Sequence, residues 1–129
     1  MTTSKSSVLN YFHTEFQSTT VLNPELEDQF MLKAIGDFEL NLEPIKYDNT
    51  NEVFGVILSN SEQSLLGKLM YKHYLTRERD RILKLNNIVG KDISLTSMGQ
   101  AKSSILKACE SVDYEIEKII SRLKTNSYN

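Results

Sequence analysis

Residues 97–123 read SMGQAKSSILKACESVDYEIEKIISRL, and this stretch decides the fold class. Its apolar residues recur at steps of three and four: Met98, Ala101, Ile105, Ala108, Val112, Ile116, Ile119 and Leu123. That spacing places them on one stripe, about 100° wide, of a helix about 40 Å long. The sequence therefore predicts a long amphipathic helix, and we expect the rest of the chain to cover its apolar stripe.

A shorter, acidic helix is predicted from Asn23 to just before Pro44. Asn23 is a suitable N-cap, and Pro24 suits the first helical position. The apolar residues that follow keep helical spacing: Leu26, Phe30, Met31, Ala34, Ile35, Phe38 and Leu42. Gly36 inside this helix costs roughly 1 kcal/mol relative to alanine, so we expect a neighbouring helix to pack closely against it.

A second long helix is predicted from Ser59 to about Leu85. Ser59 and Glu62 have the Ser-x-x-Glu spacing of a capping box, which satisfies two backbone N–H groups at a helix start. A loop of about ten residues then leads to the helix over residues 97–123. This short connection predicts that the two long helices form an antiparallel pair.

The remaining segments are shorter. Leu9, Phe12 and Phe16 have helical spacing and predict a short N-terminal helix. Turn residues over 44–52 predict a loop. The apolar segment 53–58 finds no partner strand in the sequence, so we interpret it as a buried extended connector, with strand pairing between subunits as the alternative.

These elements predict an all-α fold, a small helical bundle with two long antiparallel C-terminal helices and a shorter acidic N-terminal helix. The 129 residues fit a single core. We expect a polar N-terminal arm with a short helix over residues 1–22, the bundle over residues 23–124 and a polar tail over residues 125–129. No apolar run is long enough for a membrane span.

Few residues point to chemistry. The chain has one cysteine, Cys109, and two histidines, His13 and His73, which are sixty positions apart. We interpret Cys109 as a buried, inert thiol and His73 as a packed or surface histidine. The glycines are scattered singly, and no nucleophile elbow surrounds a serine. The sequence predicts no metal site, no cofactor and no enzymatic activity.

Charge is unevenly distributed along the chain. Residues 24–48 hold seven acidic and two basic residues, a balance of −5, although the whole chain carries only −2. Residues 68–84 hold six basic and two acidic residues, a balance of +4. The basic residues of this second segment are Lys68, Lys72, Arg77, Arg79, Arg81 and Lys84.

Three interpretations fit this charge split. The two faces are solvated or paired within the monomer, or the acidic face of one subunit meets the basic face of the next, or the arginines bind phosphates in a salt-dependent manner. The second contact is heterologous and closes into a ring when the rotation between subunits allows it. Its predicted interface residues are Arg77, Arg79 and Arg81 against Asp37, Glu39 and Glu43.

A series of short segments from about residue 26 onward carries a family resemblance. The segments are Ala34-Ile35-Gly36-Asp37-Phe38, Tyr47-Asp48, Phe54, Leu58-Ser59, Glu62-Gln63, the run from Leu65 to Met70, Asp92-Ile93-Ser94-Leu95, Ala101, Leu106 and Tyr128. In their order they resemble the small head–tail connector (adaptor) proteins of tailed bacteriophages.

The resemblance implies a non-enzymatic virion protein of the neck, made in the host cytoplasm. Such proteins form a ring beneath the portal, extend the DNA channel and dock the stopper or tail. The implied partners are the portal protein, neighbouring copies of the chain, a stopper or tail-completion protein, and genomic DNA that passes without sequence-specific contact. No membrane is implied. The predicted partner-contact residues are Ile88, Val89 and Ile93, with Tyr128 in a tail that reaches towards the portal.

Two other functions remain open from the sequence. The first is a small helical nucleic-acid-binding or regulatory protein that uses the basic face of residues 68–84. The acidic total charge and the lack of a short two-helix unit joined by a tight turn argue against it. The second is a non-catalytic inhibitor or chaperone that presents an amphipathic helix to one partner.

Overall fold

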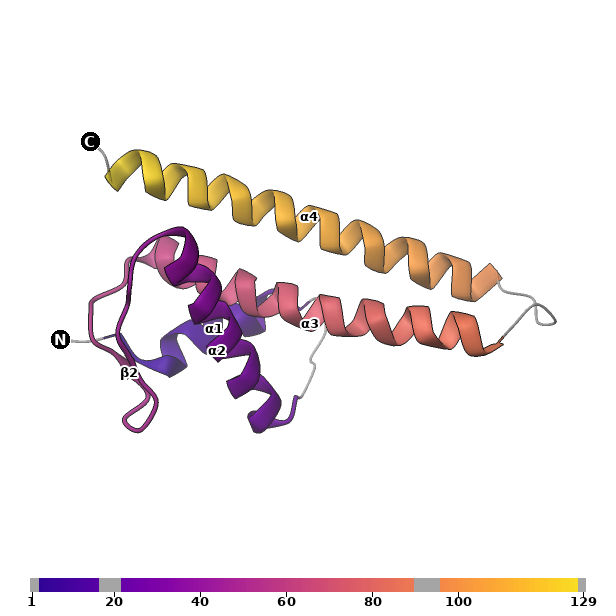
Figure 1. The fold of residues 1–129 in the computed structure, drawn as a ribbon, viewed down its shortest axis with the longest axis horizontal. Helices are drawn as coiled ribbons and strands as arrows, with labels where there is room; N and C mark the ends of the chain where they lie inside the picture. The colour runs from indigo at the N-terminus through magenta and orange to yellow at the C-terminus, as the bar shows by residue number, and fades with distance from the viewer. Residues whose placement is uncertain (1–2, 17–21, 90–95, 128–129) are drawn as a thin grey trace.

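The chain folds into four helices and one minimal hairpin. The computed structural model describes residues 3–16, 22–89 and 96–127, with side chains over 3–16, 22–85 and 100–125. Its elements are α1 (Lys5–Thr14), α2 (Pro24–Asn41), β1 (Tyr47–Asp48), β2 (Val53–Phe54), α3 (Asn60–Val89) and α4 (Thr96–Ser127). The predicted all-α bundle is confirmed, and α3 and α4 form the expected long antiparallel pair (Figure 1).

The helix at the centre of the bundle is α3, because α1, α2 and α4 all pack against it. We expected the remainder of the chain to assemble around α4, but α4 instead lies along one side of α3 (Figure 1). The predicted face of α4 is the one that it buries. Val112 and Ile116 are buried, and Ile105, Ala108, Ile119 and Leu123 are partly buried against the core.

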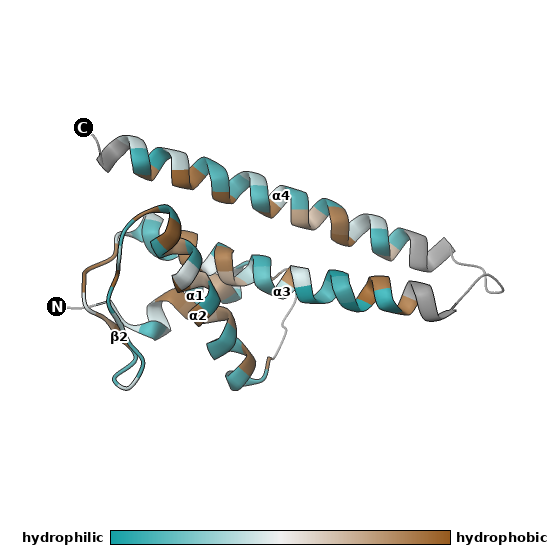
Figure 2. Cartoon of the chain, in the orientation of Figure 1, coloured by the Kyte–Doolittle hydropathy of each residue, from teal (hydrophilic) through white to brown (hydrophobic). Residues whose placement is uncertain are grey.

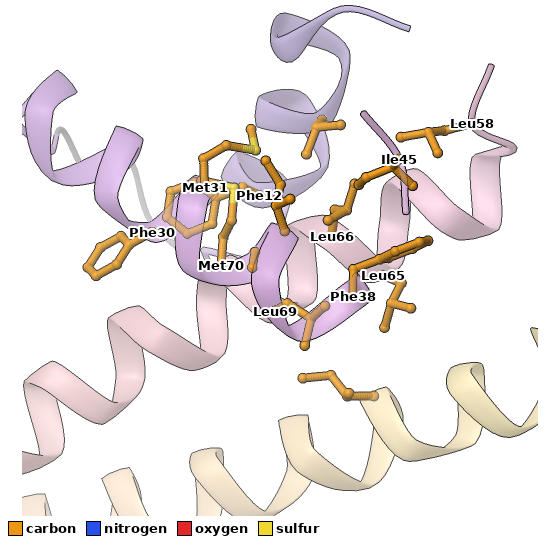
Figure 3. Close-up of a cluster of buried hydrophobic side chains, with 14 of the residues drawn as sticks. Phe12, Phe30, Met31, Phe38, Ile45, Leu58, Leu65, Leu66, Leu69 and Met70 are labelled. Atoms are coloured by element: carbon orange, nitrogen blue, oxygen red, sulfur yellow. The ribbon is translucent and has the colours of Figure 1, made fainter. Parts of the chain in front are cut away.

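The core is concentrated around the first half of α3. From this helix, Leu65, Leu66, Leu69, Met70 and Leu75 are buried. They meet apolar side chains of α1 and α2, including Phe12, Met31 and Phe38, in a single cluster (Figure 3). Phe54 of the hairpin belongs to the same cluster. Burial of these side chains from water is the main stabilising contribution to the fold.

The N-terminal segment is part of the bundle rather than a loose arm. Ser4 caps α1 by accepting a hydrogen bond from the Ser7 backbone N–H, and Val8 and Phe12 of this helix are fully buried. The predicted boundary after residue 22 is therefore not a boundary of the core. Sequence reasoning underestimated α1 because a helix of ten residues contributes only two fully buried side chains.

The close helix contact occurs at a different glycine from the one expected. A Cβ atom placed on Gly67 of α3 would lie 2.8 Å from both the Phe12 backbone nitrogen and the Tyr11 Cβ, so α1 passes directly over this glycine. Gly36 of α2 is exposed, and among the described residues no atom beyond its own stretch of helix lies within 4 Å of the corresponding position. The prediction of close packing at Gly36 is therefore wrong within this chain.

The apolar segment after the loop also differs from expectation. Tyr47 pairs with Phe54 and Asp48 with Val53 in an antiparallel hairpin of two residues per strand. Ser4 adds an isolated bridge to Val53 on the other side. The partner strand thus comes from within residues 44–52, which we predicted as loop, because two residues are too few to give an alternating pattern.

The predicted helix starts are confirmed. The Asn23 side chain accepts a hydrogen bond from the Glu25 backbone N–H, and Ser59 and Glu62 make both bonds of the capping box. The C-terminal ends extend further than predicted, with α3 reaching Val89 and α4 reaching Ser127, so most of the predicted tail is helical. Among the described residues, no helix is long and apolar enough to cross a membrane.

Candidate interaction surface

An open groove of about 830 Å³ lies between the N-terminal half of α2 and the second half of α3, and we call it the α2–α3 groove. Leu26 and Phe30 of α2 supply its apolar lining. Its charged lining residues are Glu25, Lys33, Arg77, Asp80, Arg81 and Lys84. Four cations against two carboxylates give this groove a net positive charge, although the chain as a whole is acidic.

Much of this positive charge is available to a partner. Lys33, Arg77 and Lys84 have no ion-pair partner among the side chains that the structure describes. Arg81 is different, because its Nη2 donates to Glu78 at 2.8 Å along the same helix. Of the three arginines predicted for a subunit interface, Arg77 is therefore the one that lines the groove unpaired.

Arg79 lies on a different side of α3. It does not line the groove, and its guanidinium pairs with Asp80 at 3.4 Å. Its charge acts on Cys109 of α4: burial raises the pKa of that thiol, and Arg79 lowers it in part. Cys109 is partly buried rather than buried as we predicted, and its raised pKa lowers the thiolate fraction at neutral pH.

The start of the basic segment is used within the monomer. Lys68 Nζ lies 2.9 Å from carboxylate oxygens of both Glu15 and Glu115, and so it joins α1, α3 and α4. Burial lowers the pKa of Lys68, but the hydrogen bonds that it donates to the two carboxylates, and their negative charges, outweigh burial and leave the pKa raised. Lys72 pairs with Asp113 of α4 at 3.4 Å. These two lysines stabilise the bundle and do not belong to the groove.

Of the three acidic interface residues that we predicted, two are already engaged. Asp37 Oδ2 lies 2.7 Å from His73 Nε2, which joins α2 to α3. Glu39 accepts a hydrogen bond from the Ile45 backbone N–H at 2.9 Å. Glu43 is exposed and has no ion-pair partner among the described side chains. His73 is thus a packed histidine, and no group of three candidate metal ligands occurs among the described residues.

The outward face of α2 combines exposed apolar side chains with negative charge. Leu32, Gly36 and Leu40 follow one another at four-residue steps on the side of α2 opposite the core, and the two leucines are 52% and 85% exposed. Glu43 follows shortly after the helix end and is exposed. We call these four residues the α2 ridge.

Sequence reasoning found part of this surface and missed the rest. Lys33 was not predicted as a site residue, because the acidic residues around it dominate the charge count. The ridge leaves a signal in the sequence, a Leu-x-x-x-Gly-x-x-x-Leu spacing out of phase with the core positions, of which we considered only Gly36. The predicted partner-contact residues Ile88, Val89, Ile93 and Tyr128 lie outside the described side chains.

Comparison of the chain with models of protein families, with curated proteins and with solved structures finds no match.

Proposed function

We propose that this chain is a non-enzymatic structural protein of a bacteriophage virion, a head–tail connector. In this role it forms a ring beneath the portal, extends the DNA channel and docks the stopper or tail at the neck of the particle. No bond is made or broken, so the function consists of shape and contact. The implied partners are the portal protein, neighbouring copies of the chain and a stopper or tail-completion protein.

The observation that carries this proposal is where the family-like segments lie in the fold. Ala34, Ile35 and Phe38 belong to the buried face of α2, and Phe54 of β2 lies in the same core. Glu62, with Ser59, caps α3. The part of the resemblance that lies in residues 34–70 therefore follows one contiguous unit, α2–hairpin–α3, that holds the bundle together. Because many functions share a helical bundle, this supports the function by analogy.

The surface of the protein supports the same proposal. A ring component needs surfaces that engage its neighbours. This chain has an α2–α3 groove whose Lys33, Arg77 and Lys84 lack an ion-pair partner among the described side chains, and an exposed apolar α2 ridge. Exposed ion pairs contribute about 0–1 kcal/mol each, so they set register more than strength. Apolar burial, at about 25 cal/mol per Å², has to supply most of the affinity.

Native mass spectrometry of the protein alone, and mixed with the portal protein encoded in the same genome, tests this function. We expect the chain to add to the portal ring in a fixed ratio that matches the portal's symmetry. No association with the portal, together with salt-sensitive binding to duplex DNA, contradicts the connector function and favours the nucleic-acid-binding alternative. In that case the unpaired cations Lys33, Arg77 and Lys84 become the first residues to reverse.

A further inference from the structure

We infer that the α2 ridge of one copy of this chain docks in the α2–α3 groove of the next copy. This inference rests on the proposed function, because it takes neighbouring copies to form a ring and names the two surfaces through which they meet. It also changes the residues that the sequence pointed to. Asp37, Arg79 and Arg81 are engaged within the monomer, whereas Leu32, Gly36 and Leu40 join the contact.

Charge complementarity is the first observation that supports this pairing. The groove presents Lys33, Arg77 and Lys84 without ion-pair partners among the described side chains. The ridge presents Glu43, which also has no ion-pair partner among the described side chains. Glu39 precedes Leu40 of the ridge, and one of its carboxylate oxygens accepts a hydrogen bond from the Ile45 backbone N–H. Docking brings these opposite charges together. Contact between two grooves, or between two ridges, would instead bring like charges together and is disfavoured.

Apolar complementarity is the second observation. Leu32 and Leu40 are the most exposed leucines of the described chain, while Leu26 and Phe30 line the groove with apolar surface. Between the two leucines, Gly36 has open space where a side chain would lie. A glycine in a helix interior lowers helix stability, and here it lets another backbone approach α2 closely. No described residue of the same chain packs against this position.

The outward face of α4 is the competing candidate for the groove. It has exposed Tyr114 and Leu106 with Glu110 and Glu117 nearby. Lys107 and Lys118 are interleaved with these acids along the same helix, so this face carries little net charge. On α2, Lys33 follows Leu32, whereas the acidic residues Glu39 and Glu43 flank Leu40. The Leu40 end of the ridge is therefore acidic, and this favours the ridge as the occupant of a positively charged groove.

The geometry of this contact is heterologous. The helical ridge residues Leu32, Gly36 and Leu40 do not line the groove, so the proposed contact joins two different surfaces of the chain. Each added copy therefore leaves one free ridge and one free groove. Such a contact propagates until it closes into a ring or continues as a filament.

Two charge-altered variants test the pairing. The groove variant carries Arg77→Glu and Lys84→Glu, and the ridge variant carries Leu40→Lys and Glu43→Lys. We expect each variant alone to raise the protein concentration for half-assembly by about tenfold or more, measured by native mass spectrometry with and without the portal ring. An equimolar mixture should restore assembly, with the two variants alternating and an even number of copies in each ring. Restoration by mixing cannot arise from two misfolded proteins.

A control with matched chemistry is available on α4. Tyr114→Lys with Glu117→Lys alters an apolar and an acidic residue three positions apart, as the ridge variant does. We expect this control to assemble as the unmodified chain does and not to rescue the groove variant. Rescue by the control assigns the groove to α4 and overturns the inference. Normal assembly of either test variant alone, or failure of the mixture, also overturns it.

The same samples separate the inference from the proposed function. Portal binding by the unmodified chain without rescue in the mixture supports the connector function and contradicts the ridge–groove contact. Rescue in the mixture without portal binding supports the contact and contradicts the connector function. No assembly and no portal binding by the unmodified chain overturns both.

Discussion

The two halves of α3 are surrounded very differently. Residues 60–75 are covered by α1, α2 and α4, and five of their leucine and methionine side chains are buried. Residues 76–85 contain no buried side chain, although Ile82 and Leu83 are partly buried. Figure 2 shows the corresponding change along this helix, from a mixed surface inside the bundle to a largely hydrophilic one beyond it.

This difference assigns separate roles to the two halves of one continuous helix: the first half stabilises the fold, and the second half is accessible to other molecules. The first half holds the core, so its side chains set the stability of the protein. The second half is held on one side by α4 and opens on another side to the α2–α3 groove. Its cations that have no ion-pair partner among the described side chains are therefore accessible, and substitutions there are expected to leave the monomer folded.

The largest expected effect comes from truncating matched leucines in the two halves. Leu66 is fully buried, and Leu66→Ala should lower the free energy of unfolding by about 2–5 kcal/mol. Leu83 is only partly buried, so Leu83→Ala should cost less than about 1.5 kcal/mol. Urea unfolding followed by circular dichroism measures both. Equal losses would mean that the second half of α3 is as well packed as the first.

Two glycines sharpen the contrast between covered and open surface. Gly67→Ala should destabilise the protein by about 1–3 kcal/mol, because the new methyl group meets the backbone of α1. Gly36→Ala should stabilise the monomer by about 0.5–1 kcal/mol, because the methyl group enters open space in a helix. Thermal melting of both variants measures these changes in stability, which we expect to have opposite signs. A loss of stability in Gly36→Ala would contradict the open environment of α2.

The smallest effect is expected at the lysines that face α4. Lys68→Met should cost about 1 kcal/mol at neutral pH after allowance for solvent screening, and Lys72→Met should cost less, because its ion pair is half-exposed. The measurement is urea unfolding of each variant at pH 7. Equal losses would show that the three-helix contact of Lys68 adds nothing to a simple surface pair.

The pH dependence of the same contact follows from the raised pKa of Lys68. The folded state binds this proton more tightly than the unfolded state, so the contribution is complete below the ordinary lysine pKa of about 10.4 and is lost above it. Burial raises the pKa of Tyr71 and Tyr74, which adds a loss in the same direction above about pH 10. Stability should therefore fall at alkaline pH, less steeply in Lys68→Met.

Local rules predicted the helices and their starts. The spacing of apolar residues in 97–123 identified both α4 and its buried face, and the caps at Asn23 and Ser59 are formed as expected. These features depend on residues within four positions of one another, so one segment of sequence contains all the information that they need. The candidate surface was predicted only in part, through the charge split and Arg77.

The tertiary structure alone decided which helix is central, which glycine is contacted and which charges remain free. The contact at Gly67 joins residues more than fifty positions apart, and so does the Lys68–Glu15 pair. Asp37 and Arg77 look equivalent as exposed charges in the sequence, yet one is bonded to His73 and the other opens into the groove. Sequence spacing fixes the face on which a side chain lies, whereas the element that covers that face is selected by the packing of the whole chain.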